Sequence, residues 1–307
     1  MARRVLLLPP AARLAASPLP PALAQALGRA DHARAAPGRD AQCLRQFRPP
    51  PSAWPAAALA RLHEVDATAV AGALWLRADP AHLRADINGV RLLAVGAGLG
   101  MEQADVDALL PALRPLFAEA GFTLETPHPA RWYLRLPADT PLPAFSAPED
   151  ALGDDVFEHA PRGEVVRRWR ALESEAQILL HQHPHNAARM AAGQAAVNAL
   201  WFWGGGGLPR AIAAPAAAVY SDDPALRGAA RLAGVPEHPL QEAPAAPGDA
   251  LLDLRGVRAW DAPAALVQAW RGDAAEIVLD FADGQVFRLR RGQRWRLWRR
   301  PLAGLSA

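Results

Sequence analysis

The chain has 307 residues, which allows one large domain or two modest ones, and its 33 basic and 31 acidic residues give a formal net charge of +2. This balance argues against a dedicated nucleic-acid binder. Every basic residue is arginine, so lysine bases and Schiff-base chemistry are excluded, and the single Cys43 excludes an internal disulfide and a cysteine metal cluster.

The distribution of apolar residues argues against secretion and membrane insertion. The N-terminal apolar run, Val5–Leu8, is too short for a signal peptide, and no segment approaches the ~20 apolar residues that cross a bilayer. A chain with one cysteine suits a reducing compartment. We therefore expect a soluble, cytoplasmic protein with no membrane partner.

The first predicted elements are a buried strand and a hairpin. Val5–Leu8 has the apolar character of a strand inside a sheet, and the following region is rich in Ala, Pro and Arg, with helical pieces. Asn88-Gly89 separates two strand-like segments, His82–Ile87 and Val90–Val95, as a two-residue hairpin turn does.

A helix and two strands are expected next. Residues 102–120 carry apolar side chains at helical spacing, although Pro111 and Pro115 should kink or divide that helix. The strands that follow are Phe122–Thr126 and Arg131–Leu136.

An alternating strand over Ala73–Arg77 precedes the hairpin, and the order strand, hairpin, helix, strand, strand predicts a compact α+β domain over residues 72–136. We interpret this domain as an insertion. Residues 1–71 and 137–307 would then form one discontinuous α/β core domain.

Three histidines end an amphipathic helix that we expect over residues 162–182. A metal ion needs their side chains to converge, but residues two apart on a helix point in nearly opposite directions, and Pro184 interrupts the segment. A helix C-terminus whose imidazoles meet free carbonyls explains His181, His183 and His185 better. Metal binding is the weaker interpretation.

An apolar segment, Ala199–Trp203, precedes a glycine run and is typical of a strand buried on both faces of a parallel sheet. Asn186 should cap a short helix before it. Glycines beyond a strand let backbone N–H groups approach a phosphate, yet no Gly-Lys-Ser/Thr follows Gly204–Gly206 and neither nucleotide fingerprint is met. A tight structural turn is the favoured interpretation, with phosphate contact as the alternative.

The C-terminal third predicts further α/β structure with an antiparallel end. Asp223 is placed to cap a helix that begins at Pro224, and the nearby Ser221 has no identifiable base that would make it a nucleophile. The last two strands meet at Asp283-Gly284, a hairpin turn. The predicted elements of this part are strands over Ala216–Tyr220, Ala250–Leu254, Glu276–Phe281 and Gln285–Arg290, and a helix over Pro263–Trp270.

Four arginines near the C-terminus alternate with apolar residues: Arg288, Arg290, Arg294 and Arg296. On a strand they would share one face. A basic patch with neighbouring tryptophans can bind RNA or an acidic partner, but arginines also protect exposed sheet edges. Edge protection is the favoured interpretation because the rest of the chain is not basic, so nucleic acid is a disfavoured partner.

Three motifs follow one another along the chain. Two of them are Ala78–Asp86 and Arg131–Leu136. The third motif comprises Leu180, His183, Pro184, Asn186, Arg189, Gly193, Asn198, Trp201, Trp203, Gly204, Gly205, Gly206 and Pro209. Together, in this order, they resemble the bacterial family of RpfE-type regulatory proteins, and this resemblance implies a regulatory role with a phosphorylated metabolite or a protein as partner. The candidate ligand or phosphate contacts are His183, Asn186, Arg189, Asn198, Trp201, Gly204, Gly205 and Gly206.

That family is itself similar to the archaeal-type cofactor-independent phosphoglycerate mutases. The similarity implies an alkaline-phosphatase-like α/β fold, a mostly parallel sheet flanked by helices, with an inserted small α+β domain. In addition to this fold, the last two predicted strands indicate an antiparallel C-terminal hairpin. Those mutases use two divalent metals, held by aspartates and histidines, and a serine nucleophile.

The chain departs from the mutases where metal ligands are expected. Val5–Leu8 leads into Pro9-Pro10 instead of an Asp-Gly motif, residues 150–154 replace an Asp-Pro-His element, and no histidine follows His238. A two-metal phosphoryl site needs such ligands. We therefore expect a catalytically degenerate mutase-like protein with a regulatory or ligand-binding role, no catalytic residues and no cofactor.

Two alternatives stay open. One is an active, metal-dependent phosphoglycerate mutase or phosphatase that holds Mn or Zn with relocated ligands, for which the weak candidates are His181, His183, His185, Asp222 and Asp223. The other is a nucleic-acid or protein adaptor that acts through the C-terminal arginine and tryptophan hairpin.

Overall fold

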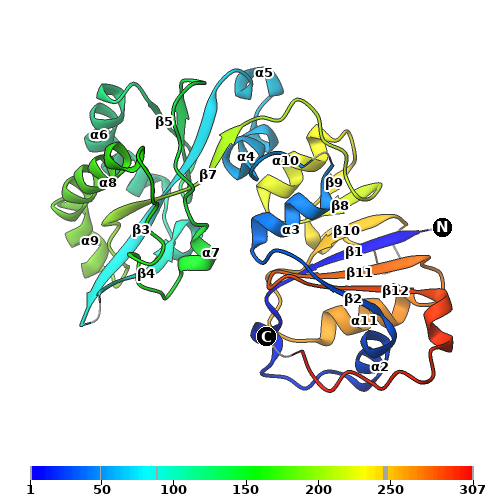
Figure 1. Ribbon diagram of the computed structural model, residues 1–307. Coiled ribbons are helices and arrows are strands. Elements are labelled where there is room, and N and C mark those ends of the chain that lie inside the picture. Colours follow the sequence, from blue (N-terminus) through cyan, green and yellow to red (C-terminus); the bar gives the residue numbers. More distant parts are fainter. Residues whose placement is uncertain (1, 49, 88, 245–247, 306–307) are drawn as a thin grey trace. The chain divides into compact units, whose positions relative to one another are not determined.

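The computed structural model describes residues 2–48, 50–87, 89–244 and 248–305 and divides into two compact units (Figure 1). The first unit comprises Met1–Trp54, Leu59–Val65 and Pro209–Ala307, and the second comprises Pro55–Ala58 and Asp66–Leu208. The second unit therefore extends well beyond the segment 72–136 that the sequence predicts as an insertion. Within the described ranges, no helix is long and apolar enough to cross a membrane.

A seven-stranded sheet organises the first unit, in the order β2-β12-β11-β1-β10-β8-β9. Its strands are β1 (Arg3–Leu8), β2 (Asp31–Arg34), β8 (Ala218–Tyr220), β9 (Glu237–His238), β10 (Ala250–Asp253), β11 (Glu276–Phe281) and β12 (Gln285–Arg290). Strands β11, β1, β10, β8 and β9 are parallel, and β12 is antiparallel to β11 and β2. The predicted α/β class, mostly parallel order and antiparallel C-terminal hairpin are confirmed.

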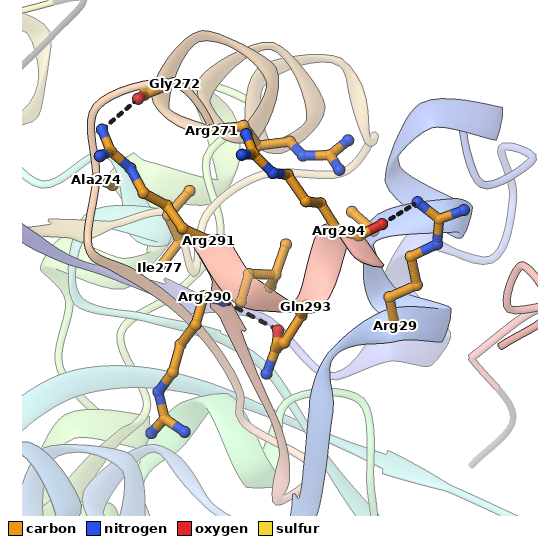
Figure 2. A pocket seen from close by; sticks show the side chains of 11 residues that line it. Arg29, Arg271, Gly272, Ala274, Ile277, Arg290, Arg291, Gln293 and Arg294 are labelled. Carbon is orange, nitrogen blue, oxygen red and sulfur yellow. Dashed lines mark hydrogen bonds between the residues drawn. The ribbon is translucent and has the colours of Figure 1, made fainter. Parts of the chain in front are cut away.

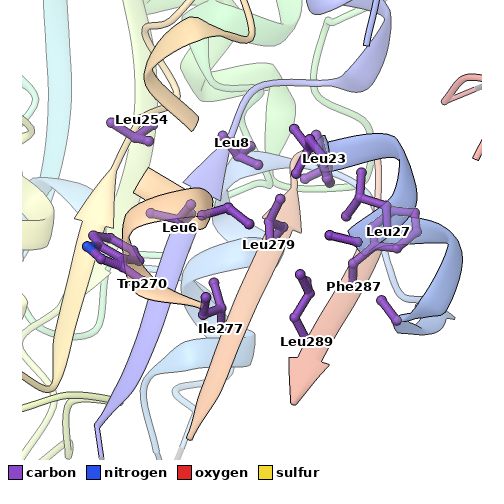
Figure 3. Close-up of a cluster of buried hydrophobic side chains, with 14 of the residues drawn as sticks. Leu6, Leu8, Leu23, Leu27, Leu254, Trp270, Ile277, Leu279, Phe287 and Leu289 are labelled. Carbon is purple, nitrogen blue, oxygen red and sulfur yellow. The ribbon is translucent and has the colours of Figure 1, made fainter. Parts of the chain in front are cut away.

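Helices cover both faces of this sheet. The helical segments are α1 (Ala11–Leu14), α2 (Pro21–Arg29), α3 (Arg39–Gln46), α10 (Pro224–Leu232), η2 (Leu240–Glu242), α11 (Asp261–Trp270) and η3 (Arg291–Trp295). Figure 1 shows α3 and α10 on one side and α2 and α11 on the other. On the α2 side, Leu6 and Leu279 of the sheet share a buried core with Leu27 and Trp270 (Figure 3). The central strands are apolar because both their faces are buried.

The second unit is built on a five-stranded sheet around one long strand, β3. Its strands are β3 (Leu74–Asp86), β4 (Gly89–Val95), β5 (Thr123–His128), β6 (Arg131–Leu136) and β7 (Ala199–Gly207). All pairings are antiparallel: β3 pairs with β4, β6 and β7, and β5 pairs with β6. The helices are α5 (Ala67–Val70), η1 (Gly96–Leu99), α6 (Gln103–Glu119), α7 (Pro148–Ala151), α8 (Val166–His181), α9 (His185–Ala191) and part of α4 (Ala56–Glu64).

Local predictions for the second unit have mixed outcomes. The predicted hairpin forms between β3 and β4, although Asn88 of its turn lies outside the described residues. Pro111 and Pro115 do not divide the predicted helix, because α6 runs through both. Leu109, Leu113 and other apolar residues of α6 are buried in one core with α8, and this burial offsets the cost of the prolines.

The prediction that Ala199–Trp203 lies in a parallel sheet is wrong. Strand β7 pairs antiparallel with β3, from Ala81↔Ala199 to Leu74↔Gly207. An apolar run reports burial of a strand and says nothing about the direction of its neighbours. Since β3 precedes β7 by more than a hundred residues, the pairing is set by long-range contacts.

Candidate functional site

The parallel strands of the first unit place two polar residues where the strand order reverses. The connection from β8 through α10 leads to β9, toward one edge of the sheet. The connection from β10 through α11 leads to β11, toward the other edge. Ligands of open α/β sheets bind beyond the carboxyl ends of the strands at such a point. Ser221 follows β8 and Asp253 ends β10, and Ser221 Oγ donates a hydrogen bond of 2.8 Å to Asp253 Oδ2. We call this pair, together with Asp223, Arg255, Asp280 and Arg45, the carboxyl edge.

Arg255 compensates the charge of Asp253. Its Nε lies 2.7 Å from Asp253 Oδ1, and its Nη2 lies 2.8 Å both from Asp253 Oδ2 and from Asp223 Oδ2. Burial acts to raise the pKa of Asp253, but the charge and hydrogen bonds of Arg255, together with Arg39 and Ser221, lower that pKa to about 2. Asp253 is therefore a buried carboxylate whose negative charge is already balanced.

Asp280 repeats this arrangement on the far side of β1. Its buried carboxylate accepts hydrogen bonds from Arg45 Nη2 at 2.7 Å and from Gln46 Nε2 at 2.6 Å. Gln42 Nε2 donates to the main-chain oxygens of Leu8 and Asp280. Three side chains of α3 thus fix the second carboxylate and the ends of β1 and β11.

The donors at the carboxyl edge do not fit a two-metal centre. Among the residues that the structure describes, no three His, Cys, Asp or Glu side chains are grouped so as to hold a metal ion. The two buried carboxylates already bind guanidinium groups, which do not deprotonate in proteins. Each oxygen of Asp253 and Asp280 therefore accepts a hydrogen bond from a protein donor.

Ser221 also lacks the surroundings of a nucleophile. It is fully buried, and its Oγ accepts a hydrogen bond of 2.9 Å from the Asp223 N–H while it donates to Asp253. The neighbouring strand β9 carries His238, but that imidazole stacks on Tyr220 with ring centroids 5.1 Å apart. A serine hydroxyl needs a base to become nucleophilic, so Ser221 joins β8 to β10 through hydrogen bonds instead.

The two aspartates that the sequence offers as weak metal ligands stabilise local structure. Asp223 caps α10 as predicted, since its Oδ1 accepts from the Ala225 N–H at 2.9 Å. Asp222 Oδ1 accepts from the Leu240 N–H at 3.1 Å.

The three histidines at the end of α8 do not gather around one point. His185 Nε2 lies 2.7 Å from Asp105 Oδ1, whereas His183 Nδ1 accepts from the His185 N–H at 3.2 Å. His181 is exposed at the last turn of α8. Within the part of the chain that the structure describes, His185 is the one of the three that pairs with a carboxylate, and its partner lies on α6.

The guanidinium group of Arg189, a predicted phosphate contact, binds other residues of the second unit. Its Nη1 lies 2.6 Å from Asp105 Oδ2, its Nη2 donates to Leu99 O at 2.8 Å, and its Nε donates to Ala195 O at 3.0 Å. Burial acts to raise the pKa of Asp105, but hydrogen bonds from the Glu102 N–H, His185 and Arg189 lower it. Arg189 and Asp105 thus link α9 to the start of α6.

The predicted asparagine contacts are also saturated. Asn186 is not the cap that the sequence predicts, because α9 begins one residue earlier. Its side chain instead donates to Leu180 O and Val197 O and accepts from the Val197 N–H. Asn198 exchanges two hydrogen bonds of 2.8 Å with the main chain of Leu83.

The glycine run forms part of strand β7 and does not form a loop beyond it. A Cβ on Gly204 would lie 2.8 Å from the Cβ of Ala56, and one on Gly206 would lie 2.8 Å from the Cβ of Pro55. Gly205 is packed against two leucine side chains, and the Trp201 indole donates to Ser146 O at 3.0 Å. Ligand binding by this region stays a prediction, and every contact described for its residues is internal.

The arginine stripe near the C-terminus is mostly ion-paired. Arg288 and Arg290 pair with Glu276, and Arg290 and Arg296 pair with Asp31. The hydrogen bond from Arg296 lowers the pKa of Asp31. Arg294 belongs to η3, so the four arginines do not share the face of one strand. Because β2 pairs with β12, the prediction that these arginines protect an exposed sheet edge is wrong, and nucleic-acid binding stays a disfavoured prediction.

The sequence interpretation missed Asp253, Asp280, Arg255 and Arg45. The two aspartates could have been found, because each lies at or near the end of a predicted strand, where α/β sites form. Arg45 could not, because it lies on α3, more than two hundred residues from Asp280 in the chain, whereas Arg255 lies only two residues from Asp253.

Comparison with known proteins gives short matches to phosphoglycerate mutases. A probable 2,3-bisphosphoglycerate-independent phosphoglycerate mutase of Geobacter sulfurreducens is 36% identical over 63 residues, which are 20% of this chain and 16% of the relative. The 2,3-bisphosphoglycerate-independent phosphoglycerate mutase of Methanothrix thermoacetophila is 34% identical over 62 residues, again 20% of this chain and 16% of the relative. The match thus spans about a sixth of the length of each curated relative.

Two solved structures align over most of the chain at low identity. The cofactor-independent phosphoglycerate mutase of Thermoplasma acidophilum has a TM-score of 0.39 and 16% identity, over 94% of this chain and 89% of that one. The PH0037 protein of Pyrococcus horikoshii has a TM-score of 0.46 and 13% identity, over 94% of this chain and 87% of that one. No family model matches the chain. The protein is distantly similar to cofactor-independent phosphoglycerate mutases.

Proposed function

We propose that this chain is a phosphoglycerate-mutase-like protein that does not carry out metal-dependent phosphoryl transfer and acts by binding. The distant similarity supplies the mutase-like part of this proposal. The observation that supports the loss of catalysis is the pairing of Asp253 and Asp280 with Arg255 and Arg45. Both of these buried carboxylates, which lie at or near the carboxyl ends of the strands on either side of β1, are bound to a fixed positive charge.

The chemistry of guanidinium explains why this pairing opposes phosphoryl transfer. A metal ion has open coordination positions, activates water and neutralises the transferring group. A guanidinium bound by two aspartate oxygens balances charge but offers none of these positions. The carboxyl edge therefore holds strands and helices together, and Ser221 takes part in that structural network.

A regulatory role, of the kind that the RpfE-type resemblance implies, belongs to the same proposal. The motifs that carry the resemblance lie in residues 78–209, almost all of them in the second unit. A protein that no longer turns over a phosphorylated metabolite can still bind one, or bind a partner protein, and report it. The ligand in this proposal is a phosphorylated metabolite.

The experiment combines metal analysis with turnover. The protein is purified without chelators, its Mn and Zn content is measured, and 2-phosphoglycerate, 3-phosphoglycerate and p-nitrophenyl phosphate are offered with added Mn²⁺ or Zn²⁺. We expect no stoichiometric metal and no turnover, while the Geobacter sulfurreducens relative serves as positive control. Metal-dependent turnover by this chain that disappears in Ser221→Ala would establish the active-enzyme alternative instead.

A further inference from the structure

A cavity of about 300 Å³ lies in the first unit (Figure 2). Its lining residues at the start of β11 and the end of β12 place it at the opposite end of the parallel strands from the carboxyl edge. It is bounded by α2, the turn after α11, the start of β11, the end of β12 and η3. Ile277 of β11 lines it, whereas Asp280 of the carboxyl edge lies three residues further along, ~10 Å at the rise of a strand. The cavity is therefore separate from the candidate site described above.

Five arginines line this cavity: Arg29, Arg271, Arg290, Arg291 and Arg294. None of the described residues that line it is acidic. Arg290 pairs with Glu276 and Asp31, but in the described part of the chain the other four have no carboxylate partner. The acidic residue in the adjoining turn, Asp273, is bound to Arg4 at 2.7 Å.

Three of the four remaining guanidinium groups, those of Arg29, Arg291 and Arg294, make contacts that leave their charge uncompensated. Arg29 Nη1 donates to Arg294 O at 3.1 Å, and Arg291 Nη2 donates to Gly272 O. The Arg294 guanidinium lies 5.0 Å from the centre of the Trp295 ring. Arg29 Nε is buried and makes no hydrogen bond to the described residues. Like charges in a confined space repel each other and lower the cost of bringing in an anion.

The lining has a second, apolar component. Ala26, Ala274, Ile277 and Leu289 contribute to it, and the arginines stand beside them. Planar guanidinium groups bind phosphate oxygens in pairs, and apolar surface accepts the carbon skeleton of a metabolite. A volume of about 300 Å³ is at the small end of metabolite sites, so it fits a small ligand.

We propose that this cavity binds a small organic phosphate, meaning a phosphate ester or diphosphate with a short carbon skeleton. The proposal does not depend on the loss of catalysis at the carboxyl edge. Turnover at that edge and binding in this cavity are measured separately, so either proposal can fail while the other stands.

The test measures binding of pyrophosphate and 3-phosphoglycerate to the whole chain at constant ionic strength. Pyrophosphate at millimolar concentration should raise Tm by about 3 °C or more, while sodium chloride of equal ionic strength should not. In the double variant Arg271→Gln/Arg294→Gln, the Kd for pyrophosphate should rise about 10-fold or more. Arg258→Gln, which removes an exposed arginine elsewhere in the first unit, is the matched control and should bind as the unchanged protein does.

Three outcomes would overturn the proposal. The first is no binding at millimolar pyrophosphate or 3-phosphoglycerate in the unchanged protein. The second is equal affinity in the double variant and in Arg258→Gln, which would indicate diffuse charge attraction. The third is a short single-stranded RNA that binds more tightly than either small anion and loses affinity in the same double variant, which would make nucleic acid the ligand. Circular dichroism of each variant establishes that it is folded.

Discussion

Asp253 and Asp280 stand at the same level of the sheet on either side of β1, because both are paired in register with Leu7. Residues paired in a parallel sheet point to the same face, so the two carboxylates flank one buried leucine. Arg255 and Arg45 bind them from outside the strands. This row of alternating charge and apolar surface makes the carboxyl edge a source of stability, and that can be measured.

Removing Arg255 should destabilise the protein strongly. Arg255→Met leaves Asp253 buried without its main counter-ion, which costs about 3–5 kcal/mol in comparable buried pairs. Combining it with Asp253→Asn removes the stranded charge, so the double variant should recover much of the loss. Urea unfolding of both single variants and the double variant measures the coupling. If the two single effects simply add, the pair is not coupled as described here.

Cys43 should be inert in the folded protein. The thiol is buried beside Arg255 Nη1, at 3.8 Å, and burial raises its pKa to about 12. Because the thiolate is the reactive form, a thiol reagent at pH 8 should modify Cys43 only as fast as the first unit opens. The modification rate should rise with urea. Rapid, complete labelling in the absence of urea would contradict the burial of this side chain.

The sequence predicts five of the seven strands of the first unit, because these five have local signals in the chain, and it misses β2 and β9. Val5–Leu8 and the two C-terminal strands are apolar segments bounded by turn residues, and Asp223 before Pro224 marks the start of α10. These features depend on neighbours in the chain. The mostly parallel order then follows from alternation of strands and helices.

The same reasoning from neighbouring residues fails where long-range pairing decides the direction of a strand or the partner of a polar side chain. Strand β7 is as apolar as a parallel strand, but β3 binds it antiparallel, and its glycines serve close packing. Arg189 and Asn186 are polar residues next to a glycine-rich segment, which favours a ligand site in the sequence, yet their partners are Asp105 and main-chain oxygens. Sequence spacing shows which polar groups are present and cannot show which of them the fold has already used.

Arg189→Ala should destabilise the second unit and leave the arginine cavity unaffected. The substitution removes three internal hydrogen bonds and leaves Asp105 without its arginine, for an expected loss of about 3–5 kcal/mol. Arg189→Lys should recover little, because an ammonium cannot reach the three separate acceptors. Urea unfolding followed by tryptophan fluorescence measures this loss. Weakened pyrophosphate binding in a folded Arg189→Ala protein would instead support the ligand role that the sequence predicts.

Gly204→Ala should cost more than an ordinary glycine substitution. Gly204 has a φ of +64° and its Cβ would lie 2.8 Å from Ala56 Cβ, so strain and overlap add. Gly193, with a φ of +75° and open space around it, provides the control for strain alone. We expect about 1 kcal/mol for Gly193→Ala and about 2–4 kcal/mol for Gly204→Ala by urea unfolding. Equal losses would mean that β7 can move away from Ala56 without cost.

Glu173 on α8 should make stability fall as the pH rises from 4.5 to about 7. Burial raises the pKa of this carboxyl from 4.5 to about 7, with Arg170 acting in the opposite direction. Between these two values the folded protein holds a proton that the unfolded chain releases, so the free energy of unfolding is highest at the acid end and decreases until the pH passes about 7.

Glu173→Gln is neutral at every pH. It should therefore match the unchanged protein near pH 4.5 and exceed its stability by up to ~3 kcal/mol at pH 8. Urea unfolding across this range measures the difference, and Glu175→Gln, an exposed position on the same helix, controls for the change in net charge. A gap between the Glu173→Gln and unchanged proteins that stays constant with pH would show that this carboxyl is ionised normally in the fold.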